Sequence, residues 1–190
     1  VIFTSDNGGA HYIGLDDLNK PYRGWKATFF EGGTRVPFFM QLPGVIAPGS
    51  QFTAPVSHFD IFATSAALAG VQPPADRVID GVNLIPFARG EQGGRPHEQM
   101  FWRSGAYQVA RSGDWKLQVN QTQDKLWLFN LQDDPTEQHN LVDAEPARVK
   151  ELLAQLAEFN SQQKAPLWPS LVEAPILIDK PLNRPQTIDD

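Results

Sequence analysis

Asp6, Asn7 and Lys26 are residues near the start of the chain whose types suit chemistry on a charged, oxygen-rich group. Asp6 and Asn7 are adjacent and follow the short apolar run Val1–Phe3. A carboxylate and an amide oxygen therefore lie side by side just after the end of one expected strand. Hard cations such as Ca²⁺ and Mg²⁺ take oxygen ligands of these kinds. Lys26 follows in a glycine-flanked, aromatic-rich loop, where an ammonium group can neutralise charge on a sulfate or phosphate oxygen.

Each of these signals also has an ordinary structural interpretation. Asn7-Gly8 is a common turn dipeptide, and two side chains do not complete the shell of a hard cation. Most lysines are solvated, which is the simplest account of a lone Lys26. His11 follows Asp6 closely enough to reach the same pocket and contact a substrate, although loop histidines are often simply exposed. The residues alone leave both interpretations open.

The elements that must position these residues follow a mixed α/β pattern. Val1–Phe3 has the composition of a buried parallel strand, and ligands bind at the carboxyl ends of such strands in open α/β sheets. Residues 8–35 are rich in glycine and polar groups and indicate long functional loops, which an ion pair between Glu31 and Arg35 is expected to brace. Residues 36–42 predict a second buried strand.

The middle of the chain predicts a helix that begins at Ser57. Asp60 lies three positions later, which is the capping-box spacing, and Gly70 supplies a natural end. The residues between them are mostly apolar, so this helix is expected to be well buried.

The later part of the chain predicts an antiparallel sheet that is covered by a helix. The strand candidates, separated by turn residues, are Gln99–Arg103, Tyr107–Arg111, Trp115–Val119 and Leu126–Asn130. A helix from about Pro146 to Asn160 carries one apolar stripe that can cover a face of this sheet. His97 and His139 show no partner pattern and receive no role.

Composition excludes several functional classes. The 190 residues carry a net charge of -6, which argues against nucleic acid as a partner, because its binding needs a basic face. No apolar run reaches the roughly eighteen residues that a membrane span needs. The absence of cysteine excludes disulfides, thiolate metal sites and a cysteine nucleophile within these residues.

A series of short motifs follows the Asp6-Asn7 pair in a fixed order along the chain. The motifs are Thr4–Gly8, Pro21–Lys26, Phe30–Pro37, Asp60–Thr64, Ile79–Leu84, Arg111–Leu117, Leu128–Leu131, Asp133–Glu137 and Asn140-Leu141. This ordered set covers about residues 1–160 and resembles the sulfatase family of the alkaline-phosphatase superfamily. The set is far more specific than any of its pieces.

The resemblance implies an α/β fold. The chain would be the C-terminal part of an alkaline-phosphatase-like α/β/α domain, followed by a small antiparallel sheet packed with a C-terminal helix. Prolines and glycines in residues 71–98 place a boundary near residue 95. We therefore expect residues 1–95 to belong to the catalytic domain, residues 96–162 to form the sheet-and-helix subdomain, and residues 163–190 to form an extended, proline-rich tail.

The resemblance further implies a sulfuric ester hydrolase of the arylsulfatase type, acting on a sulfate-ester substrate. It implies that Asp6 and Asn7 are ligands of a divalent cation, Ca²⁺ by preference and Mg²⁺ as the alternative, and that Lys26 contacts the sulfate as a catalytic and binding residue. The family's nucleophile is a formylglycine made from a Cys/Ser-x-Pro-x-Arg motif, which does not occur in this sequence. We therefore expect the nucleophile in a preceding N-terminal part of the same protein, and expect this chain to be inactive without it.

Two other functions stay open. One is a phosphohydrolase or phosphonate hydrolase of the same superfamily, whose di-zinc members use a histidine beside the strand's aspartate, whereas Asn7 suits one hard cation. The other is a non-catalytic binding protein on a sulfatase scaffold, which the missing nucleophile favours. Family resemblance favours a periplasmic, secreted or lysosomal location.

Overall fold

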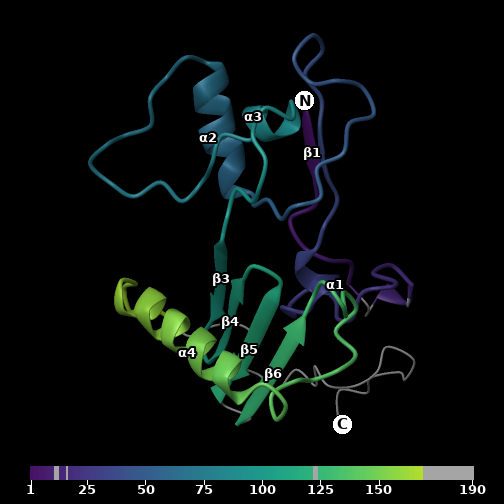
Figure 1. The fold of residues 1–190 in the computed structure, drawn as a ribbon, viewed down its shortest axis with the longest axis vertical. Coiled ribbons are helices and arrows are strands. Elements are labelled where there is room, and N and C mark those ends of the chain that lie inside the picture. The colour runs from purple at the N-terminus through teal and green to yellow at the C-terminus, as the bar shows by residue number, and fades with distance from the viewer. Residues whose placement is uncertain (11–12, 16, 122–123, 169–190) are drawn as a thin grey trace. The chain divides into compact units, whose positions relative to one another are not determined.

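The computed structural model describes residues 1–10, 13–15, 17–121 and 124–168. The chain divides into two compact units, one made of Val1–Phe3 with Phe39–Glu98 and the other of Thr4–Phe38 with the residues from Gln99 onward. Figure 1 labels the elements of both units. The predicted boundaries at residues 95 and 162 stay predictions, and residues 169–190 of the predicted tail lie outside the described residues.

The second unit is built on a four-stranded antiparallel sheet. Its strands are β3 (Gln99–Ser104), β4 (Tyr107–Ser112), β5 (Trp115–Asn120) and β6 (Lys125–Asn130), and they lie in the order β3-β4-β5-β6. All four strands were predicted, and each extends one residue beyond its predicted range. Two-residue turns join the first three strands, and Gly105 and Gly113 adopt the positive φ angles of 56° and 60° that such turns need.

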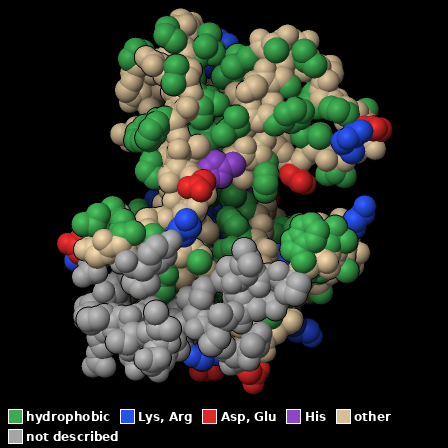
Figure 2. Space-filling view, turned by 180° about the vertical axis from the view of Figure 1, so that it is seen from behind, with side chains coloured by type: hydrophobic (Ala, Val, Ile, Leu, Met, Phe, Trp, Pro, Cys, Tyr) green, Lys and Arg blue, Asp and Glu red, His purple; other side chains and the backbone are tan. Residues whose placement is uncertain are grey.

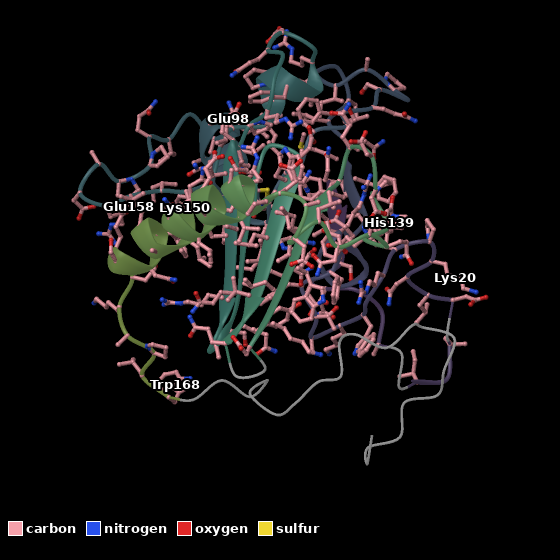
Figure 3. All side chains as sticks on the ribbon, turned by 60° about the horizontal axis from the view of Figure 1, so that its bottom comes forward. Lys20, Glu98, His139, Lys150, Glu158 and Trp168 are labelled. Atoms are coloured by element: carbon pink, nitrogen blue, oxygen red, sulfur yellow. The ribbon has the colours of Figure 1, made fainter. Side chains whose placement is uncertain are left out.

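Helix α4 (Pro146–Ser161) covers one face of this sheet, as the apolar stripe predicts (Figure 1). Val149, Leu152 and Leu156 of the helix are buried against alternate residues of the strands, including Leu117 and Leu128. The exposed Lys150 and Glu158 belong to the same helix, and Figure 3 shows side chains filling the space between α4 and the sheet.

The opposite face of the sheet is covered by the loop that contains Phe30. Phe30 is fully buried against side chains of β4 and β6, and its ring lies 5.9 Å from that of Trp127 and 6.1 Å from that of Phe129. Because side chains alternate along a strand, Lys116 and Gln118 of β5 point to this face, while Leu117 and Val119 point to the helix. The sheet therefore buries polar side chains on the face that the loop covers.

The first unit contains α2 (Phe59–Leu68), α3 (Ile85–Ala88) and most of β1 (Ile2–Thr4) and of β2 (Phe38–Met40), two strands that pair with each other. Val1 and Gln41 exchange two backbone hydrogen bonds, each of 2.8 Å. Such a mutual exchange is the pattern of antiparallel partners, whereas a buried parallel strand was expected. Phe3 and Phe39 are exposed. Among the described residues, the sheet that carries them consists of β1 and β2.

Helix α2 begins at Phe59 rather than at Ser57. The Ser57 N–H still donates to the Asp60 carboxylate at 2.7 Å, which is one arm of the predicted capping box. The helix ends as predicted: Gly70 has a φ of 67°, and the Val71 N–H donates to the Ala66 carbonyl at 2.9 Å.

The prediction that α2 is well buried is wrong in the described chain. Phe59, Phe62 and Leu68 are 60%, 52% and 51% exposed. The residues that α2 buries are Asp60, Ala63 and Thr64. Asp60 is fully enclosed and accepts hydrogen bonds from the Val82 N–H at 2.8 Å and from His97 Nε2 at 2.8 Å. This contact gives His97, which the sequence leaves without a role, a structural partner.

Figure 2 shows many hydrophobic side chains on the surface of the unit that contains α2. Across the described residues, no helix combines the length and apolar character that crossing a bilayer requires. On α2 itself, Phe59 and Phe62 lie three positions apart and therefore share one exposed apolar face.

We predict that the chain on its own self-associates through this face, because large exposed apolar patches favour association. Replacing Phe59 and Phe62 with serine should shift the sedimentation-equilibrium mass of the chain toward the monomer. Val78→Ser is the control, since Val78 is 85% exposed but lies outside any helix. A wild-type chain that sediments as a monomer at all concentrations would contradict the prediction.

Candidate functional site

Three backbone segments of the second unit stack on one another around the short helix α1 (Glu31–Thr34). The Gly8 N–H donates to the Gly33 carbonyl at 3.0 Å, and the Gly32 N–H donates to the Arg23 carbonyl at 2.6 Å. The Lys26 N–H donates to the Gly9 carbonyl at 3.2 Å, which joins the outer two segments. The loop after β1 and the loop that carries Lys26 are thus each hydrogen-bonded to α1, and they are also hydrogen-bonded to each other.

Glycine is required where these segments meet. A Cβ on Gly8 would lie 1.8 Å from the Gly32 carbonyl oxygen, and one on Gly33 would lie 2.1 Å from the Thr28 carbonyl oxygen. A Cβ on Gly32 would lie 2.4 Å from the Gly24 carbonyl oxygen. No side chain fits at these contacts, so the glycines of both sequence motifs serve close backbone approach.

The stack places the predicted site residues at its surface. Asp6 is exposed and Asn7 is half-buried, directly before the Gly8 contact, and Lys26 is exposed next to Ala27, which has a left-handed φ of 78°. Within the part of the chain that the structure describes, the side chains of Asp6, Asn7 and Lys26 make no hydrogen bond or ion pair. These groups are therefore available to a ligand. His11 lies outside the described residues.

Asn19 ties the same loops together. Its side-chain oxygen accepts from the Gly9 N–H at 2.7 Å, and its amide group donates to the Gly9 carbonyl at 2.8 Å and to the Gly24 carbonyl at 3.3 Å. One side chain thus holds the loop that follows Asp6-Asn7 and the loop that precedes Lys26 at a fixed spacing.

Beneath the stack lies a buried ion cluster that consists of Lys116, Glu31 and Glu137. The Lys116 ammonium donates to Glu31 Oε1 at 2.8 Å and lies 3.0 Å from Glu137 Oε1. Glu137 Oε2 accepts from the backbone N–H of Glu31 at 2.5 Å, and Glu137 Oε1 accepts from Gln118 Nε2 at 3.1 Å. The expected Glu31–Arg35 pair is also present, but it is longer, at 3.8 Å, and exposed on the arginine side. The principal brace of Glu31 is therefore Lys116.

Charge within the cluster is divided unequally. Burial alone would lower the pKa of Lys116, but the nearby Glu137 and Glu31 carboxylates outweigh it and raise that pKa. Burial would raise the pKa of Glu31, and the Lys116 ammonium with two arginines holds it below its ordinary value. Burial raises the pKa of Glu137, and the Glu31 carboxylate adds to that rise. One lysine charge thus serves two carboxylates.

Tyr107 and Arg23 extend the cluster toward the loops. The Tyr107 hydroxyl donates to Gln118 Oε1 at 2.5 Å and accepts from the Phe29 N–H at 2.9 Å. Arg23 donates to the Glu137 backbone carbonyl at 3.0 Å, and its guanidinium carbon lies 4.2 Å from the centre of the Phe30 ring. Burial lowers the pKa of Arg23 from its ordinary value.

Comparison with known proteins identifies the family. The family model described as N-sulphoglucosamine sulphohydrolase, C-terminal, matches residues 23–164, which is well over half of the 190 residues. The chain belongs to the sulfatase family. The matched model covers the C-terminal portion of a sulfatase, as the order of motifs predicts.

Individual relatives agree with this assignment. Steryl-sulfatase of Rattus norvegicus is 39% identical over 142 residues, a stretch that covers 71% of this chain and 24% of that protein. The crystal structure of Ps i-CgsB in complex with k-i-k-neocarrahexaose matches with a TM-score of 0.77 at 28% identity, over 89% of this chain and 38% of that one. The chain therefore spans about a quarter of the length of that steryl-sulfatase.

A phosphonate hydrolase shares the fold. The crystal structure of phosphonate monoester hydrolase of Agrobacterium radiobacter matches with a TM-score of 0.61 at 25% identity, over 85% of this chain and 34% of that one. Together with the sulfatase structures, this likeness confirms the predicted alkaline-phosphatase-like α/β fold with its small antiparallel sheet and C-terminal helix.

The predicted metal ligands Asp6 and Asn7 have the oxygen groups that a hard cation takes. Asp6 and Asn7 offer adjacent oxygen ligands without partners among the described residues, which suits a hard cation. The described residues contain no group of three acidic, histidine or cysteine side chains that would hold a metal ion.

Lys116, Glu137 and Gln118 are the residues of this sulfatase that sequence reasoning missed. Lys116 and Glu137 both lie within motifs that carry the family resemblance, yet neither has a local partner pattern, since Glu31 and Lys116 are 85 positions apart. The available signal was the alternation in β5, which sets Lys116 and Gln118 on one face. Polar residues on one face of a strand ordinarily predict solvent rather than burial.

We predict that Gly8→Ala destabilises the folded chain by about 1–3 kcal/mol, because its Cβ must displace the Gly32 carbonyl. Gly93→Ala is the matched control, since a Cβ there meets nothing within 4 Å, and should change the free energy of unfolding by less than about 0.5 kcal/mol. Urea unfolding of both variants measures the difference. Equal stability of the two variants would refute the close approach at Gly8.

Glu31 should make stability depend on pH on the acid side. Its pKa is lower in the folded chain than the ordinary value of about 4.3, so its stabilising contribution is present above that pH and is lost as pH falls through the folded pKa. We expect Glu31→Gln to lower the free energy of unfolding at pH 7, and the gap to wild type to shrink toward pH 3. The exposed Glu98→Gln serves as control in urea titrations, and a gap that stays constant with pH would contradict the prediction.

Proposed function

We propose that the protein containing this chain hydrolyses sulfate esters, and that this chain supplies part of the cation and sulfate site. The observation that carries the proposal is the close backbone packing at Gly8, Gly24, Gly32 and Gly33, which we call the glycine stack. In it, the Lys26–Gly9 hydrogen bond joins the Asp6-Asn7 loop to the Lys26 loop. Membership of the sulfatase family supports the reaction type, and the free side chains support the roles of the residues.

Each residue has a defined task in the proposal. Asp6 and Asn7 hold the divalent cation through hard oxygen ligands, which suit Ca²⁺ and Mg²⁺ alike. The family resemblance favours Ca²⁺. When bound, such a cation withdraws charge from a sulfate oxygen. Lys26 places a second positive charge on the same group, and His11 is retained as a further substrate contact.

The reaction consumes one water molecule, breaks the ester oxygen–sulfur bond, and returns an alcohol and hydrogen sulfate. The attacking group in sulfatases is a formylglycine, and its motif is absent from these 190 residues. We infer that it lies in a preceding part of the same protein, that this part is the chain's partner, and that the chain alone is inactive. An arylsulfatase-like substrate and a periplasmic, secreted or lysosomal location are the corresponding proposals.

Phosphonate hydrolysis is the second candidate, because the Agrobacterium radiobacter phosphonate monoester hydrolase shares the fold. The two reactions are separated by assaying the intact protein with 4-nitrophenyl sulfate, 4-nitrophenyl phosphate and a phenylphosphonate ester. We expect the sulfate to give the highest kcat/KM and a calcium chelator to abolish turnover. A higher kcat/KM for phosphate or phosphonate would overturn the sulfatase proposal, and the coding sequence before Val1 should contain Cys/Ser-x-Pro-x-Arg.

In the intact protein, Asp6→Ala should abolish cation-dependent turnover, and Lys26→Ala should lower kcat by about a hundredfold or more, because each removes charge stabilisation at the sulfate. Asp17→Ala and Lys20→Ala are matched controls, since these residues form an exposed ion pair with each other in the same loop region. Both controls should retain wild-type kcat and KM. Normal turnover by Asp6→Ala or Lys26→Ala would remove that residue from the site.

A further inference from the structure

The buried ion cluster joins three segments that are far apart in the sequence. Lys116 is the second residue of β5, Glu31 opens α1, and Glu137 follows β6. Lys116 and Glu137 are fully buried, and Glu31 is nearly so. Buried ion pairs are weak evidence for stability, because well-packed apolar residues often stabilise a core as much. The contacts of the cluster therefore point to a role in addition to the stability that Glu31 contributes.

Glu137 occupies an unusual backbone conformation for a glutamate. Its φ is 57°, in the left-handed region that glycine adopts without strain, and its side chain is completely enclosed. The chain keeps a carboxylate at this strained position, where it contacts Lys116, Gln118 and the Glu31 N–H. Strain of this kind persists where the surrounding contacts determine it, and it clusters at functional sites.

Glu137 is linked to both of the segments that carry the proposed site, directly to the Arg23 loop and through α1 to the Asp6-Asn7 loop. Its carboxylate holds the first N–H of α1, and the Gly33 carbonyl of α1 holds the Gly8 N–H next to Asn7. Its backbone carbonyl accepts from Arg23, in the loop that leads to Lys26. The Arg23 carbonyl accepts in turn from the Gly32 N–H. A continuous set of hydrogen bonds thus runs from the cluster to both loops.

We propose that Lys116 and Glu137 are positioning residues, which hold α1 and thereby set the spacing of the Asp6-Asn7 cation ligands from Lys26. The inference rests on the function proposed above for these three residues. Neither Lys116 nor Glu137 would touch the substrate. Their neutralisation should loosen the loops while leaving the sheet folded.

The test uses Glu137→Gln, which keeps the shape and removes the charge, and Lys116→Met, which keeps most of the length and removes the charge. Hydrogen exchange by NMR on the chain should show about tenfold or greater loss of protection at the Gly8 and Lys26 amides, with the Ala110 and Val119 amides of the central strands β4 and β5 unchanged. In the intact protein, calorimetric titration with Ca²⁺ should show a Kd raised about ten- to a hundredfold. The kcat for 4-nitrophenyl sulfate should fall by a similar factor per folded molecule.

Asp124→Asn is the matched control, because Asp124 is an exposed acid with a positive φ of 50° and should change none of these measurements. Lys116→Arg, which restores the charge, should recover part of the lost protection. If Lys116→Met does not fold, Glu137→Gln decides the question alone. Wild-type protection at Gly8 and Lys26 in Glu137→Gln, or an equal loss at the sheet amides, would overturn the positioning role.

The outcomes separate this inference from the proposed function. If the wild-type intact protein cleaves no sulfate ester, the proposed function fails, while loss of exchange protection and of Ca²⁺ affinity in Glu137→Gln would still support positioning. If the wild type cleaves sulfate esters and Glu137→Gln keeps its kcat, Ca²⁺ affinity and amide protection, only the positioning role fails.

Discussion

Burial of the Lys116 ammonium demands opposite charge within reach, because an unpaired ammonium in the protein interior is costly. Glu31 and Glu137 meet that demand from two different loops, and both loops are thereby held against one face of the sheet. The sheet itself needs no such contact, since α4 completes the apolar core on the other face. What depends on Lys116 is the placement of α1, and with it the loops that stack on α1.

The glycine stack translates this anchoring into the geometry of the site. Backbone groups of Gly8, Gly24 and Gly32 approach more closely than any side chain would permit, so the loops cannot shift without losing hydrogen bonds. Asp6, Asn7 and Lys26 sit at the surface of this rigid base with their side chains free among the described residues. The backbone of the loops is held in place while the side chains stay available for binding, which suits a preorganised site for a charged ligand.

Several parts of the fold follow from local pattern. Alternating apolar residues and turn glycines predict β3–β6, and the apolar stripe of residues 146–160 predicts that α4 covers a face of the sheet. The same reasoning overestimates the burial of α2, whose Phe59 and Phe62 are exposed. An apolar composition shows that a helix can be buried, but whether a partner covers it is a property of the tertiary assembly.

The sequence by itself determined the family, through the order of the motifs along the chain, and the candidate site residues Asp6, Asn7 and Lys26. These signals lie within short stretches of neighbouring residues. It did not determine that Lys116 and Gln118 face a buried layer, since alternation alone favours solvent for polar residues. Glu137 reaches the Glu31 N–H across 106 positions and Lys116 reaches Glu31 across 85. Only the tertiary structure decides such pairings, because the charges that satisfy a buried lysine need not be near it in the chain.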